Sequence, residues 1–337
     1  MENADYRTVC LEGGDQVGKA DASSVMISKL ESEGVNLTYT SFPIYSTPVG
    51  STIRTLLKEG SPEDVLSAES DLNVRMALFA LNRLEFLDVF LNDDKYANTL
   101  LLLDRSPYSN ALTIAYGLSE HEDWENEKVQ ALIEKALDYD SFMIHKLGLD
   151  NCVVQLKSNS SNWKNIRKGE TDTYEEDSVQ ERCDDVYEMY KGGVGDSWHE
   201  IVTKDDSGWR DREEICGDIS DVIFNKYGIM SDIRQGETYN VGFKEIVKSM
   251  YPMANYDRKT YSIYSKALKS NQKVLMYSNG VKLGQEVANS CINIRFKNKE
   301  IRDEYRRIVL ELPEILSVFQ YTLGRSYVGK LMRALDL

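Results

Sequence analysis

Apolar and polar positions alternate in two ways along the first 228 residues of the chain. Short apolar runs, typical of buried strands, are separated by longer segments in which apolar residues recur at the spacing of an amphipathic helix. This alternation predicts the α/β class, with a five-stranded parallel sheet flanked by helices. The strands are expected at residues 6–11, 36–42, 99–103, 151–156 and 199–203. The helices are expected at residues 19–33, 47–58, 72–91, 108–116, 126–137, 175–191 and 210–226.

The pattern changes near residue 228, and beyond it the periodicity is mostly helical. In one predicted helix, Tyr305, Ile308 and Val309 share an apolar face, while arginines lie nearer the other side. Because such a helix cannot bury its apolar face alone, we expect a small C-terminal bundle that packs against the rest of the chain. The sequence thus predicts two domains, residues 1–228 and a mostly helical, basic domain of residues 229–337.

The charge distribution changes at the same place. The net charge is −15, and it divides into −22 over residues 1–231 and +7 over residues 232–337. A basic tail of this kind either docks on the acidic remainder of the chain or binds another anion, such as nucleic acid. Docking is favoured, because 11 acidic residues dilute the charge of the tail and it contains no recognised nucleic-acid motif.

The remaining composition excludes several classes of protein. Five scattered cysteines with no C-x-x-C pair indicate reduced thiols, and therefore a cytoplasmic protein. Three isolated histidines argue against a histidine-rich metal site. The longest aliphatic run, residues 100–103, is far too short to span a membrane, and the polar N-terminus does not resemble a secretory signal.

Residues 9–24, VCLEGGDQVGKADASS, nearly match the phosphate-binding pattern G-x-x-x-x-G-K-[ST]. Gly13, Gly18 and Lys19 fit the pattern, but Ala20 stands where a hydroxyl residue is expected. The segment follows a predicted strand and opens a predicted helix, so its backbone N–H groups can converge on phosphate oxygens. Lys19 would then reach the β- and γ-phosphates. Taken alone, the segment is also compatible with an ordinary glycine turn.

Four further motifs follow this loop in order. They are SFPIYSTPVGSTI (41–53), ALFALNRLEF (77–86), LLLDRSPYSNA (101–111) and TYEEDSVQER (173–182). Together with the loop they resemble the thymidylate kinase family of P-loop kinases, over about residues 1–228. The resemblance implies phosphoryl transfer from ATP to dTMP with Mg²⁺, in a cytoplasmic homodimer. It leaves residues 229–337 unmatched.

The resemblance also implies the residues of the site, in four sets. The expected ATP-binding residues are Gly13, Gly14, Gln16, Val17, Gly18, Lys19, Ala20, Asp21, Lys164 and Lys168. The expected dTMP-binding residues are Asp15, Phe42, Pro43, Tyr45, Phe79, Arg83, Arg105, Ser109, Asn110 and Tyr174. The expected catalytic residues are Lys19, Asp104, Arg105 and Arg167, and the expected metal ligands are Asp15, Asp104 and Glu175.

The residue types suit a deoxypyrimidine. Phe79 and Arg83 lie four residues apart on one predicted helix and therefore share a face. The resemblance implies that Phe79 stacks on thymine and Arg83 meets its edge; without it, Phe79 would be read as a core aromatic. Asn110 offers both a donor and an acceptor, which suits N3–H and O4 of thymine. Asp15 is implied to accept the 3′-hydroxyl of the deoxyribose.

The phosphate end of dTMP is assigned to the next motif and to the segment after it. Asp104 and Arg105 follow an apolar strand, and ligands bind at the carboxyl end of strands in open α/β sheets. Arg105 would clamp the monophosphate with two hydrogen bonds, and Asp104 would face the metal. Tyr174 resembles the family's tyrosine that crowds the 2′ position and favours deoxyribose.

The polar, basic segment 158–173 takes the place of the family's lid. Gln16 stands where some members keep a catalytic cation in the loop, so we expect the cation in the lid. Arg167 is favoured over Lys164 and Lys168 for its planar fork. A solvated basic loop is the alternative.

This chain departs from the family pattern where chemistry takes place. Ala20 removes the usual magnesium ligand, and Asp21 beside it is unusual; Ser106 replaces an aromatic residue, and Tyr45 replaces a common arginine. Because Mg²⁺ retains several waters and uses substrate phosphates as ligands, we still expect an active enzyme. Two alternatives stay open. One is a kinase for a modified deoxypyrimidine, free or within DNA, and the other is a non-catalytic nucleotide-binding module.

Overall fold

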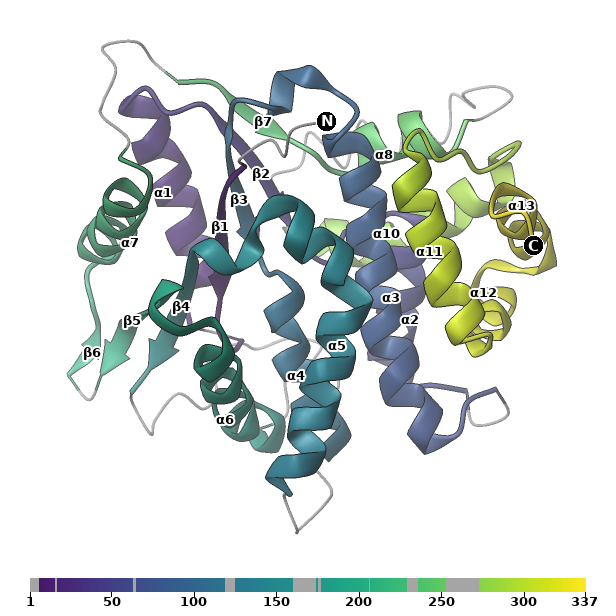
Figure 1. Cartoon of the computed structure of the whole chain (residues 1–337), viewed down its shortest axis with the longest axis horizontal. Coiled ribbons are helices and arrows are strands. Elements are labelled where there is room, and N and C mark those ends of the chain that lie inside the picture. Colours follow the sequence, from purple (N-terminus) through teal and green to yellow (C-terminus); the bar gives the residue numbers. More distant parts are fainter. Residues whose placement is uncertain are drawn as a thin grey trace. The chain divides into compact units, whose positions relative to one another are not determined.

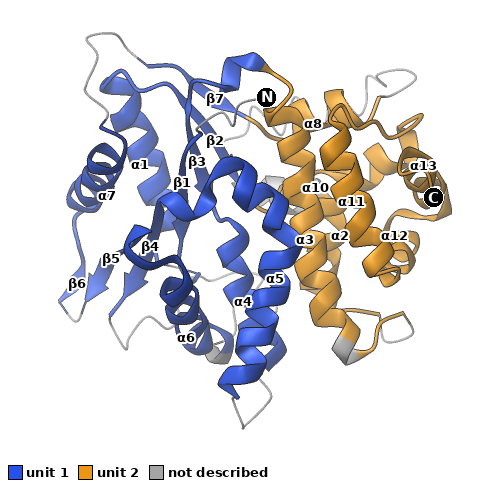
Figure 2. Cartoon of the chain, in the orientation of Figure 1, with its two compact units in different colours: residues 1–41, 94–240 blue, residues 42–93, 241–337 orange. Residues whose placement is uncertain are grey.

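The chain forms two compact units in the computed structural model, which describes residues 6–15, 17–62, 65–118, 125–159, 174, 177–205, 207–228, 236–252 and 273–337. Unit 1 comprises residues 1–41 and 94–240, and unit 2 comprises residues 42–93 and 241–337 (Figure 2). Unit 2 therefore joins an internal segment to the C-terminal region. The units divide the chain at other positions than residue 228, so the predicted domain boundary stays a prediction.

Unit 1 is built on a seven-stranded sheet with the order β6-β5-β4-β1-β3-β2-β7 (Figure 1). All neighbouring strands are parallel except β5 and β6. The strands are β1 Arg7–Glu12, β2 Leu37–Ser41, β3 Leu100–Asp104, β4 Val153–Ser158, β5 Trp198–Asp205, β6 Gly208–Trp209 and β7 Thr238–Asn240. The five predicted strands are confirmed as β1 to β5, and β6 and β7 add a short strand at each edge.

The helices of unit 1 form two groups. The helices are α1 Lys19–Ser32, α4 Asn110–Leu118, α5 Asn126–Leu147, α6 Asp177–Val194 and α7 Arg212–Tyr227. The apolar faces of α1 and α7 join the core with β1, β3 and β4, and α4 packs with α5 and α6 (Figure 1). The predicted α/β class is confirmed. The helix expected to end at residue 137 continues to Leu147, because Tyr139, Met143 and Leu147 extend its buried face.

Unit 2 is helical. Its helices are α2 Pro48–Glu59, α3 Ala68–Phe90, α8 Phe243–Met250, α10 Lys273–Ser290, α11 Lys299–Glu311, α12 Glu314–Leu323 and α13 Arg325–Ala334. Helices α10 and α12 pack on α2, and α8 and α11 pack on α3 (Figure 2). Tyr305, Ile308 and Val309 of α11 are buried, as their spacing predicts. The helical C-terminal region is therefore confirmed, and it completes a bundle around α2 and α3. None of the helices in the described part of the chain has the length and apolar character needed to cross a membrane.

Candidate active site

The phosphate-binding segment forms a tight loop between β1 and α1. Gly13 and Gly18 have φ angles of 134° and 87°, which side chains rarely adopt. A Cβ at Gly13 would also collide with the carbonyl oxygen of Leu156, so the loop lies directly against β4. Lys19, at the first position of α1, is buried and donates hydrogen bonds from Nζ to the carbonyl oxygens of Gly13, at 2.6 Å, and Gly14. The loop and its lysine thus have the expected strand–loop–helix arrangement.

The charge of Lys19 is weakened by its surroundings. Burial, and then the nearby Arg105 guanidinium, lower the pKa of Lys19 to about 8, although Asp15, Asp104 and Glu12 oppose the shift. Because burial removes most of the water around the Lys19 ammonium, a bound anion would stabilise its charged form. A polyphosphate has the required charge.

Asp104 and Arg105 lie at the carboxyl end of β3. Arg105 has a φ angle of 70°, a left-handed conformation that non-glycine residues rarely adopt and that is often found at functional sites. Its Nη2 donates to Asp15 Oδ1, and its buried Nη1 has no hydrogen-bond partner among the described residues. Burial alone would lower the pKa of Arg105, but the surrounding carboxylates, led by Asp15, raise it, so the guanidinium stays charged.

Glu12 is a site residue that the sequence reasoning missed. It is the last residue of β1 and is fully buried. Its Oε1 accepts hydrogen bonds from the backbone N and Oγ of Ser106, at 2.7 and 2.6 Å, and its Oε2 accepts from Ser109 Oγ at 2.5 Å and Tyr187 OH at 3.0 Å. Burial raises the pKa of Glu12, although these donors and Arg105 act against the shift. The available signal was an acidic residue at the end of an otherwise apolar strand.

The contacts of Glu12 account for two of the sequence features. Ser106, which replaces an aromatic residue of the family pattern, donates two hydrogen bonds to Glu12 from its backbone N and its hydroxyl. Ser109, expected to contact the base, donates its hydroxyl to the same carboxylate. Glu12 therefore fixes the start of the segment that leads from Arg105 into α4.

Asn110 differs from its neighbours because its side chain has no hydrogen-bond partner in the described part of the chain. It is 1% exposed at the first position of α4, and neither its Oδ1 nor its Nδ2 is hydrogen-bonded among the described residues. Buried amides are nearly always hydrogen-bonded in folded proteins, and the Asn110 amide is one of the buried polar groups in the described part of the chain that lack a partner within the protein.

Tyr174 is buried, and its hydroxyl donates to Thr113 Oγ1 at 3.1 Å. Gln180 of α6, also missed from the sequence, donates to the carbonyl oxygen of Tyr174 at 2.6 Å and accepts from the backbone N of Asp15 at 2.8 Å. Gln180 thus ties Tyr174 to the phosphate-binding loop.

Among the described carboxylates of the candidate site, that of Asp104 fits Mg²⁺ best. The carboxylate of Asp15 is paired with Arg105, and that of Glu12 accepts from four donors. Among the described residues, Asp104 accepts from the hydroxyls of Ser41, at 3.0 Å, and Tyr39, at 3.3 Å. No group of three metal-binding side chains occurs in the described part of the chain. A single carboxylate with nucleotide oxygens and waters is an ordinary magnesium environment, and Asp104 suits it.

Of the remaining residues expected at the phosphate end of the site, three are described and five lie outside the described part of the chain. Val17 is buried in the loop; Ala20 is partly exposed, and Asp21 is exposed, 3.8 Å from Arg212. The expected residues that lie outside the described part of the chain are Gln16, Lys164, Arg167, Lys168 and Glu175.

Five of the expected dTMP-binding residues belong to unit 2, on α3 and in the turn that precedes α2. From residue 74 to residue 90, α3 is buried at every position except Phe79, which is partly exposed. Arg83, one turn further along, is 2% exposed. Phe79 is therefore the position in this stretch of α3 where part of an aromatic ring reaches the surface.

The turn between β2 and α2 carries the other three. Phe42 is buried and packs edge-on against Phe86, with ring centroids 5.5 Å apart, so its ring belongs to the core of unit 2. Pro43 follows it through a cis peptide bond. Tyr45 is partly exposed, and the guanidinium carbon of Arg54 lies 5.4 Å from the centre of its ring.

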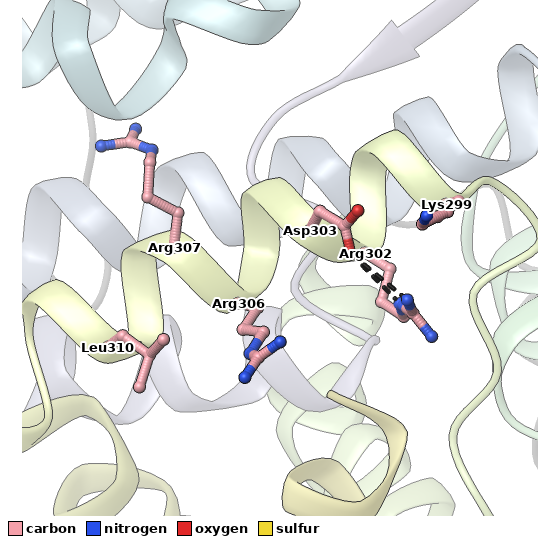
Figure 3. A pocket seen from close by; sticks show the side chains of 6 residues that line it. All are labelled: Lys299, Arg302, Asp303, Arg306, Arg307 and Leu310. Carbon is pink, nitrogen blue, oxygen red and sulfur yellow. Dashed lines mark hydrogen bonds and ion pairs between the residues drawn. The ribbon is translucent and has the colours of Figure 1, made fainter. Parts of the chain in front are cut away.

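A surface groove with basic residues runs along α11 in the C-terminal region. Its lining residues are Lys299, Arg302, Asp303, Arg306, Arg307 and Leu310 (Figure 3). Arg302 pairs with Asp303 and Asp336, and Arg307 pairs with Glu304 and Glu311. Arg306 and Arg307 also point to different sides of the helix (Figure 3). Two of the four cations that line the groove are therefore paired with neighbouring carboxylates.

The sheet, with a glycine loop and a buried lysine between its central strand and first helix, has the architecture typical of P-loop proteins. Residues 11–135 match the family model described as thymidylate kinase, which confirms over that segment the resemblance predicted from the sequence. The C-terminal region lies outside the match.

A solved structure of thymidylate kinase from Candida albicans, reported for the origin of its broad substrate specificity and a novel structural element, is also similar. The sequence identity is 18% and the TM-score is 0.46, with 66% of this chain and 92% of that chain covered. No curated protein sequence matches the chain.

Proposed function

We propose that this protein transfers the γ-phosphoryl group of ATP to dTMP, giving dTDP and ADP. The observation that carries the proposal is a pair of buried polar groups in unit 1 that have no partner among the described residues: Nη1 of Arg105 and the side-chain amide of Asn110. Both residues fall in the motif that resembles the dTMP-binding segment of the family. A phosphate oxygen would accept a hydrogen bond from Arg105 Nη1, and the edge of a pyrimidine would pair with the Asn110 amide.

The reaction needs positioning and charge neutralisation more than covalent chemistry from the protein. An oxygen of the dTMP phosphate attacks the γ-phosphorus, the bond to the β–γ bridging oxygen breaks, and ADP leaves with that electron pair. The loop N–H groups and Lys19 hold the β- and γ-phosphates. When bound, Mg²⁺ neutralises charge on the same oxygens, and Asp104 is the residue that would hold it.

Arg105 holds the acceptor phosphate, and its pairing with Asp15 keeps the guanidinium oriented toward the loop. In the same proposal, Asp15 accepts the deoxyribose 3′-hydroxyl, Tyr174 favours deoxyribose, and the lid supplies Arg167. The homodimer and the cytoplasmic location implied by the resemblance belong to this proposal too.

One departure favours a second candidate function. Ala20 cannot supply the hydroxyl that usually binds magnesium beside the loop lysine. A protein altered in this way could bind nucleotides without turning them over. Its function would then be exerted by another part of the chain.

The two candidates are separated by magnesium-dependent ADP release across dTMP, dUMP, dCMP and a thymine-containing DNA oligomer. We expect turnover that is fastest with dTMP, and we expect Lys19→Ala to abolish it. Nucleotide binding without turnover would support the non-catalytic candidate. Turnover with the oligomer in place of the free monophosphates would support a kinase acting on DNA.

A further inference from the structure

Two buried carboxylates on α3 contact the C-terminal region of the chain within unit 2. Asp88 accepts hydrogen bonds from the backbone N of Lys297, at 3.0 and 3.2 Å, and of Asn298, at 2.8 Å, directly before α11 begins. Glu85, one turn earlier, accepts at Oε1 from the hydroxyl of Tyr251, the residue that follows α8. Both carboxylates are fully buried, so these contacts lie inside the bundle.

The second oxygen of Glu85 connects this contact to the turn that precedes α2. Its Oε2 accepts from Thr47 Oγ1 at 2.6 Å and from Asn82 Nδ2 at 3.0 Å. Asn82 Oδ1 in turn accepts from the backbone N of Ile44 at 2.7 Å. Thr47 caps α2 by accepting from the backbone N of Gly50 at 3.1 Å. Tyr251 is therefore linked through Glu85 to both ends of the turn.

Helix α10 also approaches this turn closely. A Cβ at Gly284 would collide with the carbonyl oxygen of Thr47 and would lie 2.6 Å from Cβ of Ser51. Further along α2, the hydroxyls of Thr52 and Thr322 are 2.8 Å apart. The C-terminal helices thus contact the beginning and the middle of α2.

The turn itself carries residues 42–45, which the sequence assigns to the dTMP-binding set. Within the turn, the backbone N–H groups of Tyr45 and Thr47 donate to the carbonyl oxygens of Pro43 and Ile44, at 3.0 and 3.2 Å. The N–H of Ile44 is held instead by the side chain of Asn82, and the Thr47 hydroxyl caps α2. Both side chains are hydrogen-bonded to Glu85.

We propose that the C-terminal region is a positioning element of the acceptor subsite: Tyr251 orients Glu85, and Glu85 fixes the turn of residues 42–47 through Thr47 and Asn82. The importance of the turn for dTMP rests on the proposed function. The hydrogen-bond network itself does not. Tyr251 and Glu85 act through other residues and touch no reacting atom, so they are positioning residues.

The test compares Tyr251→Phe with Tyr305→Phe. The first removes the donor to Glu85 and leaves the ring in place. The second is a matched control, because the Tyr305 hydroxyl is equally buried in the same part of the bundle but, among the described residues, makes no hydrogen bond to Glu85. The measurements are the KM values for dTMP and ATP, the thermal midpoint, and deuterium exchange at the amides of Ile44 and Gly50.

We expect Tyr251→Phe to raise the KM for dTMP about tenfold, since a buried carboxylate oxygen loses its donor, while the KM for ATP stays the same. Exchange at Ile44 and Gly50 should become faster in this variant and remain unchanged in Tyr305→Phe. A general loss of stability would instead raise exchange throughout unit 2, and it would not change the KM for dTMP selectively over the KM for ATP. Glu85→Gln, which puts an N–H donor where an acceptor is needed, should act in the same direction if Tyr251→Phe does not fold.

Wild-type KM values and wild-type exchange in both variants would overturn the inference. If the wild-type protein turns over no deoxypyrimidine monophosphate, the proposed function fails, and exchange decides the positioning claim alone. Unchanged exchange at Ile44 and Gly50 would then refute it, and faster exchange confined to the turn would support it.

Discussion

The charged side chains of the candidate site are mostly buried, and their neighbours determine their charge states. Lys19 lies among carbonyl oxygens and carboxylates, whereas Glu12 lies among hydroxyls and a backbone N–H. Away from water such interactions are strong, so removing one partner affects the others. Predictions at this scale concern the protonation of a single group or the exposure of a single ring.

Lys19 should make ATP binding sensitive to pH near 8. Its pKa is lowered to about 8, so the charged form, which binds phosphate, predominates below that pH and is lost above it. We therefore expect ATP affinity to fall as the pH rises through 8, with uptake of a proton on binding. Titration calorimetry in two buffers of different ionisation enthalpy measures this uptake. Lys19→Arg keeps its charge and is the control; equal proton uptake in both proteins would contradict the assignment.

Phe79 should contribute to dTMP binding and little to folding. Removing a stacked ring weakens base binding by about 1–3 kcal/mol, and Phe79→Ala should show a loss of this size in dTMP affinity. Phe86 lies on the same helix but is fully buried, so Phe86→Ala should instead cost about 3–5 kcal/mol of the free energy of unfolding. Unchanged dTMP affinity in Phe79→Ala would show that Phe79 is a packing residue of the bundle and does not bind the base.

At the scale of elements, the sequence predicts what local patterns determine. The strands β1, β3 and β4 were predictable because each contains an apolar run that ends in polar residues. The strands β2 and β5 are more polar, but they contain the β-branched and aromatic residues typical of strands. The strands β6 and β7 were not predictable, because two or three residues show no alternation. Both are defined by pairing with a neighbouring strand.

The same distinction applies to the candidate site. The loop glycines, Lys19 and Arg105 were predictable because they occur in motifs of fixed spacing. Glu12 and Gln180 were not, because their roles depend on residues about a hundred or more positions away, such as Ser106 and Tyr187 for Glu12. Spacing along the chain contains no information about such contacts.

The approach of α10 to α2 leads to a prediction for two glycines. Gly284→Ala should destabilise the protein by about 1–3 kcal/mol, because the new methyl group meets the backbone of Thr47. Gly329 in α13 is the matched control, since the nearest atom to an added Cβ is 3.7 Å away. There alanine should stabilise the helix by about 0.5–1 kcal/mol. Urea unfolding of both variants measures the difference, and equal stabilities would contradict the close packing.

At the scale of the whole molecule, the C-terminal region belongs to the fold of unit 2. The expectation from charge was docking on an acidic body, and the described contacts add detail: they are apolar packing on α2 and α3, together with hydrogen bonds to the buried carboxylates Glu85 and Asp88. Net charges of −22 and +7 did not predict contacts of this kind.

A truncation after Gly228 should therefore fail to fold properly. It would expose the faces of α2 and α3 that the C-terminal helices cover, so we expect aggregation or loss of a cooperative thermal transition. Circular dichroism with thermal melting, compared with the full chain, measures this. A truncated protein that is equally stable and fully active would refute the structural role of the region.

The central claim is that the chain transfers a phosphoryl group from ATP to dTMP. The most direct measurement is the fate of a labelled γ-phosphate after incubation of the full chain with ATP, Mg²⁺ and dTMP, with Lys19→Ala as the control. We predict that the label appears in dTDP in step with ADP formation and that the Lys19→Ala protein produces neither. Label found only in inorganic phosphate, or only in ATP, would contradict the claim.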